Sequence, residues 1–132
     1  MFDYKWWFTI PEIVENMRVP LESGDTIHAL RLMMDGLNYL RDARDNGQLA
    51  ECLGEPVSLG SVRWDTLVAA SLRYVLHQMG EEAPAWTRKQ PLDVFWWPTS
   101  TWSQQQYIDM AHSPVELSNM GIFMDERDFT TV

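Results

Sequence analysis

The stretch SVRWDTLVAASLRYVLHQMG, residues 61–80, decides the fold class, because its apolar residues follow a helical period. Ser61 can cap the start of a helix, and Gly80 can end one. The apolar side chains recur at spacings of three and four and fall on one broad face: Trp64, Leu67, Val68, Leu72, Val75, Leu76 and Met79. The stretch therefore predicts a long helix with a buried face.

A second amphipathic stretch, SGDTIHALRLMMDGLNYLRDARDNG at residues 23–47, predicts another long helix. Ser23 or Asp25 can cap its start, and Gly47 ends it. Its apolar stripe consists of Ile27, Leu30, Met34, Leu37 and Leu40. Gly36 lowers helix propensity by about 1 kcal/mol relative to alanine, so we expect it to allow a close contact with another helix.

Shorter helices are expected next to these two. Residues 11–17 predict one with Pro11 at its first position. Residues 48–53 predict a helical turn or two. Two long helices joined by a short one make a helical hairpin the natural core, so the expected fold class is all-α.

Two further helices are expected towards the C-terminal end. The first spans residues 102–111 and is capped by Ser100 or Thr101. The second is capped by Ser113, and Glu116 completes a capping box three residues later. A short extended piece and a final turn follow.

The length of 132 residues predicts a single helical domain, residues 1–132. Residues 1–10 form an aromatic N-terminal arm that is expected to fold back onto this domain. Residues 81–101 contain three prolines and show no amphipathic period. We expect them to form an irregular Trp/Pro-rich segment that covers the open side of the hairpin.

The net charge of −9 limits the classes of partner. It disfavours nucleic acid, whose phosphates are bound by cationic side chains. It suits docking to a basic protein. Cys52 is the only cysteine, which excludes an internal disulfide and predicts a small buried residue in a reducing cytoplasm. No apolar run is long enough for a membrane span, and no leader pattern starts the chain, so we expect a soluble cytoplasmic protein.

Catalytic patterns are missing from the sequence. His28, His77 and His112 are the candidates for acid–base chemistry, but none belongs to a paired-histidine motif, and the chain has no glycine-rich phosphate loop or GxSxG elbow. Acidic residues gather near the end of the chain without the further oxygen ligands that a metal needs: Asp125, Glu126 and Asp128. We therefore assign no catalytic residue, no cofactor and no metal ligand.

Tryptophan is the stronger signal, with seven among 132 residues. Trp and Tyr are enriched at the energetic centres of protein interfaces, yet large rings also fill cores. We expect Trp64 and Trp86 to be structural. The candidates for partner binding are Trp6, Trp7, and one or other of Trp96 and Trp97.

Three segments occur in the order of a known family: SVRWDTLVAASLRYVLHQMGEEAPAWT at 61–87, FWWP at 95–98 and SPVELSNMGIFMDERDF at 113–129. In this order the chain resembles, over residues 22–129, a family of small helical actinobacterial proteins. The resemblance implies an association with helix-turn-helix regulators or toxin–antitoxin components. It implies no catalytic residue, and the arm FDYKWWF at 2–8 departs from the family pattern.

Three functions remain open on the sequence. The first is a non-enzymatic protein-binding module, an antitoxin-like or regulatory partner of another, basic protein, with a homodimer as a further alternative. The second is a small enzyme or ligand-binding protein with a pocket under Phe95–Pro98 and with His77 or His112 as acid or base. The third is a DNA-binding regulator. We favour the first.

Overall fold

The computed structural model describes residues 5–99 and 103–129. Within them all regular secondary structure is helical, and the only strand-like feature is an isolated bridge, which confirms the all-α class. The chain divides into two compact units, residues 1–57 and 58–132. The single domain expected from the length stays a prediction, as does the pairing of the two long helices, which lie in different units.

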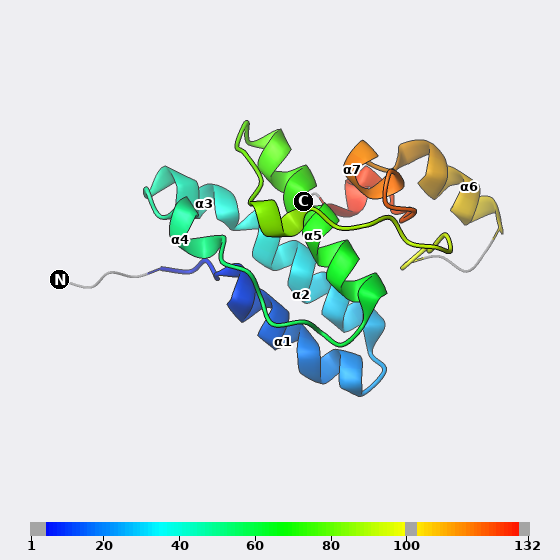
Figure 1. Ribbon diagram of the computed structural model, residues 1–132, viewed down its shortest axis with the longest axis horizontal. Coiled ribbons are helices and arrows are strands. Elements are labelled where there is room, and N and C mark those ends of the chain that lie inside the picture. Colours follow the sequence, from blue (N-terminus) through cyan, green and yellow to red (C-terminus); the bar gives the residue numbers. More distant parts are fainter. Residues whose placement is uncertain (1–4, 100–102, 130–132) are drawn as a thin grey trace. The chain divides into compact units, whose positions relative to one another are not determined.

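The first unit contains four helices, coloured blue to blue-green in Figure 1: α1 (Ile10–Glu22), α2 (Thr26–Asn38), α3 (Leu40–Asp45) and α4 (Leu49–Cys52). The turn between α1 and α2 is short, so these two helices pack side by side as an antiparallel hairpin. α3 packs against α4.

α1 is longer than the helix expected at 11–17. Thr9 caps it and forms a capping box with Glu12, in which each residue's side chain accepts a hydrogen bond from the other's backbone N–H. Pro11 occupies the second helical position. The helix continues through Pro20 because that residue extends a fully buried face, whose packing outweighs the one missing backbone donor.

The helix expected over residues 25–47 is two helices. Asp25 caps α2 by accepting a hydrogen bond from the backbone N–H of His28 at 3.1 Å. The break falls at Tyr39, which follows the last residue of α2 and precedes the first residue of α3. The buried stripe also differs from the expected one, since Ile27 is 66% exposed. Leu30 and Leu37 are buried as expected, as is Leu40 in α3, and the other buried residues of α2 are Ala29, Met33 and Gly36.

Gly36 faces Ile13 of α1 at very short range. A Cβ atom at position 36 would lie 2.7 Å from both Cγ1 and Cδ1 of Ile13. Real carbon atoms do not approach so closely, so only glycine fits here. The close helix contact expected at Gly36 is confirmed.

The second unit is built on α5 (Val62–Gln78), whose expected bounds are confirmed and whose cap is Ser61. The other elements are the short helices η1 (Ala85–Thr87), α6 (Ser103–His112), α7 (Val115–Ser118) and η2 (Glu126–Phe129). Both η1 and α7 pack against α5 (Figure 1).

The expected irregular segment has only η1 and one bridge residue in its described part, 81–99. Trp96 pairs in parallel with Ile122. The backbone N–H of Trp96 donates to the carbonyl of Gly121, and that of Phe123 donates to the carbonyl of Trp96, both at 2.9 Å. The short extended piece expected after Gly121 is therefore held by the Trp/Pro-rich segment.

The capping box expected at Ser113 and Glu116 is wrong. α7 starts at Val115, after Pro114, and has no side-chain cap. The hydroxyl of Ser113 is engaged elsewhere, because it accepts a hydrogen bond from the backbone N–H of Met124 at 2.9 Å. The caps expected for α6, Ser100 and Thr101, lie outside the described residues.

The contact between α1 and α2 yields a stability prediction. Gly36→Ala should lower the free energy of unfolding by about 1–3 kcal/mol, because the strain of overpacking exceeds the gain in helix propensity. In an Ile13→Ala background the same change should no longer destabilise, since the atoms that clash are gone. Urea denaturation followed by circular dichroism measures both.

Asp35→Ala is the matched control, because Asp35 lies one position away on a part of α2 that does not face Ile13. It should leave stability nearly unchanged in either background. An equal effect of Gly36→Ala with and without the Ile13 side chain would contradict the proposed contact.

Candidate functional site

A cavity of about 360 Å³ lies in the second unit, where α5, the end of η1 and α7 come together. α5 contributes Ala70, Arg73 and His77, whose spacing of three and four puts them on one side of the helix. Residues 87–89 line a second side, and α7 contributes Glu116 among others. The volume is within the range of pockets for small ligands.

The cavity is cationic although the chain as a whole is acidic. Three of the five basic residues in 58–132 line it: Arg73, Arg88 and Lys89. Within the described part of the chain, none of the three has a carboxylate within ion-pair distance. Their charges are therefore available to a negatively charged group in the cavity.

Thr87 fixes the position of Arg73. Its side chain is buried, and its Oγ1 accepts a hydrogen bond from Nη1 of Arg73 at 3.2 Å. The same hydroxyl donates to the carbonyl of Pro84 at 2.6 Å. With its hydroxyl hydrogen committed to Pro84, Thr87 is poorly placed to act as a nucleophile and instead orients the guanidinium.

His77 and Glu116 form the other polar pair of the cavity. Nδ1 of His77 lies 3.1 Å from Oε2 of Glu116, whose side chain is 13% exposed. The carboxylate orients the imidazole and leaves its Nε2 free to meet a ligand. A histidine oriented by a carboxylate suits acid–base chemistry, but the residues lining the cavity include no serine or cysteine nucleophile.

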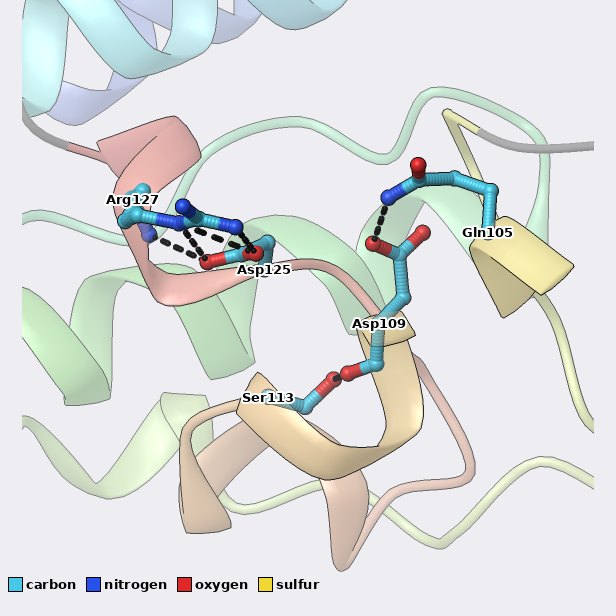
Figure 2. A network of polar contacts seen from close by, with 5 residues as sticks. All are labelled: Gln105, Asp109, Ser113, Asp125 and Arg127. Carbon is cyan, nitrogen blue, oxygen red and sulfur yellow. Dashed lines mark hydrogen bonds and ion pairs between the residues drawn. The ribbon is translucent and has the colours of Figure 1, made fainter. Parts of the chain in front are cut away.

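A second feature of this unit is α6, whose one buried side chain is polar. Asp109 is 1% exposed and is the only buried residue of the helix. Its Oδ1 accepts a hydrogen bond from Nε2 of Gln105 at 3.0 Å, and its backbone carbonyl accepts one from the hydroxyl of Ser113 at 2.5 Å. Gln105, Asp109 and Ser113 follow one another at intervals of four positions and therefore lie on one side of the chain (Figure 2).

The exposed residues of α6 include three large apolar ones, which is unusual for a helix whose buried residue is an aspartate. Tyr107 is 75% exposed, Ile108 42% and Met110 41%. We call these three residues the α6 surface. With about 100° between successive residues, Tyr107 points to the side opposite Asp109, and Ile108 and Met110 lie about 100° to either side of it. The backbone carbonyl of Gln106 and the hydroxyl of Ser113, just after the helix, bond to Trp97 and to the backbone of Met124, and the apolar side chains of the α6 surface remain accessible.

Asp125 and Arg127 form a close ion pair next to this network (Figure 2). The guanidinium makes contacts of 2.6 to 3.1 Å with both carboxylate oxygens. These bonds hold the pKa of Asp125 below its ordinary value, and the backbone N–H of Arg127 acts in the same direction. Burial raises the pKa of nearby Asp128, and the charges of Asp125 and Asp109 add to this.

The tryptophans proposed for partner binding have different environments. Trp6 is 48% exposed and donates from Nε1 to Oδ2 of Asp42 at 2.8 Å, while Trp7 is only 7% exposed and packs edge-on against it. The described part of the arm, from Lys5 on, thus folds back onto its own unit, as expected for these two rings. The burial of Trp7 leaves little of its ring for a partner.

Trp96 and Trp97 are both partly buried and point to different neighbours. The ring of Trp96 meets Trp64 edge-on, with ring centres 5.3 Å apart. The ring of Trp97 packs on Phe123, and its Nε1 donates to the backbone carbonyl of Gln106 in α6 at 3.2 Å. Trp97 therefore borders α6.

The sequence did not locate the cavity. None of the residues Phe95–Pro98, under which a pocket was expected, lines it. His77 does line it, whereas His28 and His112 do not. The sequence signal for the cavity is the run Arg88–Lys89, two adjacent basic residues in an acidic chain.

Three smaller expectations concern the rest of the chain. Cys52 is 2% exposed, as expected, and burial raises the pKa of its thiol. In the described ranges no three His, Cys, Asp or Glu side chains are placed to hold a metal ion. No helix in those ranges combines the length and the apolar character that crossing a membrane requires.

Comparisons of the chain with protein-family models, with curated proteins and with solved structures found no match. The resemblance to the actinobacterial family stays a prediction.

The ion pair of Asp125 and Arg127 predicts a pH dependence. Because the pKa of Asp125 is lower in the folded chain, its stabilisation is complete above the unfolded value of about 4 and is lost as the pH falls through the folded value. Arg127→Gln should therefore lower stability at neutral pH and make the further loss below about pH 4 shallower. Urea denaturation at a series of pH values measures this.

Asp128 acts with the opposite sign, since its raised pKa makes acidification favour the folded chain. Introducing Asp128→Asn into both the unmodified chain and the Arg127→Gln variant removes that contribution from the comparison. Arg31→Gln, at an exposed arginine of the other unit, is the control for loss of one charge. If Arg31→Gln changes the loss of stability below about pH 4 as much as Arg127→Gln does, this loss does not come from the ion pair of Asp125 and Arg127.

Proposed function

We propose that the chain is a non-enzymatic protein-binding module, an antitoxin-like or regulatory partner, that binds a basic protein through the α6 surface. The observation that carries this proposal is the inverted polarity of α6. Its buried residue is the charged Asp109, while Tyr107, Ile108 and Met110 are exposed.

Leaving apolar side chains in water gives up stabilisation. Burying apolar surface is worth about 25 cal/mol per Å², so a helix that only completed the fold would turn these residues inward. Here the one buried position of the helix is occupied by Asp109, which accepts a hydrogen bond from the exposed Gln105. The arrangement keeps the apolar side chains for a contact outside the chain.

Charge supports a basic partner. The net charge of −9 attracts a positively charged protein at long range and speeds its encounter, whereas burial of apolar and aromatic side chains supplies most of the affinity. Trp97 borders α6 through its bond to the carbonyl of Gln106, so its ring is suited to extend the contact. Its neighbour Trp96 is engaged with Trp64 and is a weaker candidate.

An association with a regulator or a toxin, implied by the resemblance, is compatible with this proposal. A direct contact with DNA is not favoured, because the acidic charge would repel phosphate. The alternative of a ligand-binding protein has its own support in the cavity of the second unit and does not exclude a protein partner.

Photo-crosslinking tests the surface and captures the partner in the same step. A photoreactive phenylalanine analogue at Tyr107 should give one stoichiometric adduct with a basic protein in the native host. The same analogue at Val62, which is 75% exposed in the same unit, should give none. An adduct with the mass of two copies of the chain, or no adduct above the Val62 background, would overturn the proposal.

Affinity for the captured protein then measures the contribution of the surface. Combined Tyr107→Gln, Ile108→Gln and Met110→Gln changes should weaken binding by about a hundredfold, because truncating central apolar side chains commonly costs about 1 kcal/mol or more each. Glutamine keeps helix propensity, so α6 should persist. Val62→Gln is the control and should bind as the unmodified chain does. Equal weakening by both variants would contradict a specific role for α6.

A further inference from the structure

We propose that the cavity lined by α5, residues 87–89 and α7 binds a small organic phosphate monoester, with Arg73, Arg88 and Lys89 around the phosphoryl group. This site is independent of the proposed protein contact, because no residue of the α6 surface lines the cavity.

The charges select an anion. Three cationic side chains line one cavity and have no carboxylate partner among the described residues. The acidic group in the wall, Glu116, is engaged by His77 at 3.1 Å. A phosphate monoester carries close to two negative charges at neutral pH. It therefore balances three cationic side chains better than a single carboxylate would.

Arg73 is held ready for such a group. Its Nη1 is bonded to the buried hydroxyl of Thr87, which is itself anchored on Pro84. A guanidinium has further N–H groups in a planar fork that matches two phosphate oxygens. Because one of its donors is already fixed, less side-chain freedom is lost when a ligand binds.

The remaining walls suit the organic part of the ligand. A volume of about 360 Å³ exceeds what a bare phosphate fills and falls at the lower end of small-ligand pockets. Nε2 of His77 and the amide of Asn119 can bond hydroxyl groups. Ala70, Val115 and Met120 offer apolar surface to a carbon skeleton. These features favour a phosphorylated polyol over inorganic phosphate.

Calorimetry with the purified full chain tests the ligand class. Ribose 5-phosphate is the probe, ribose tests the need for the phosphoryl group, and succinate tests whether any dianion suffices. We expect binding of ribose 5-phosphate that inorganic phosphate competes with, and no binding of ribose. Preference for succinate would overturn the phosphate assignment, and absence of heat with all probes at millimolar concentration would overturn the site.

Variants locate the binding. Lys89→Gln and Arg88→Gln change exposed side chains and should each weaken ribose 5-phosphate by about tenfold, as expected for the loss of a charge-assisted contact, with an unchanged melting temperature. Arg63→Gln removes the same charge from the same unit outside the cavity and should have little effect. Equal weakening by Arg63→Gln would show a general charge effect and overturn the site.

Arg73→Lys keeps the charge but loses the planar fork. It should weaken the phosphate monoester by about tenfold, because a lysine cannot bond two oxygens in parallel. Because Arg73 also contacts Thr87, its melting temperature is measured in parallel. Unchanged affinity in all three cavity variants would overturn the proposal even if the chain binds ribose 5-phosphate.

Discussion

The C-terminal half of the second unit depends on the hydroxyl of Ser113. It donates to the carbonyl of Asp109 at the end of α6 and accepts from the backbone N–H of Met124. One side chain thus joins a helix to a segment eleven residues further along the chain. Without it, a buried backbone donor would lack its bond, which costs more than an ordinary surface hydrogen bond is worth.

Two sites of opposite character result within one unit. The α6 surface is apolar and convex on the outer side of a helix, whereas the cavity is cationic and concave. They share no residue, and they draw on different interactions, apolar burial in one case and charge-assisted hydrogen bonds in the other. A protein partner and a small ligand are therefore compatible functions of the same chain, and each can be removed without the other.

The sequence predicted the helices better than their contacts. The period of residues 61–80 indicated α5 with its cap and its end, because one strong apolar face dictates a helix. The capping box of α1 was also readable, since Thr9 and Glu12 have the required spacing, but it was overlooked. The break at Tyr39 has no comparable signal. The close approach of α2 to α1 at Gly36 is likewise a tertiary distance that no local pattern encodes.

The functional features were harder to predict for the same reason. A helix that contains both Asp109 and Tyr107 is normally expected to bury the tyrosine, whereas here the aspartate is buried and the tyrosine is exposed. The cavity likewise combines a helix spacing visible at Arg73 and His77 with Glu116, which is distant in sequence. The residue types that form a site can be recognised in the sequence. Whether they lie next to one another depends on the tertiary structure.

The net charge acts with opposite sign on the two proposed ligands. At long range an acidic chain attracts a basic protein and repels an anion. At short range the anion is attracted, because Arg73, Arg88 and Lys89 would lie within a few ångströms of a bound phosphate and outweigh the repulsion by distant charges. Salt screens interactions beyond about 8 Å at physiological ionic strength but weakens contacts much less. Added salt should therefore slow association with the protein partner. Its effect on binding of the anion should be smaller, because the long-range interaction that salt screens is a repulsion in the case of the anion.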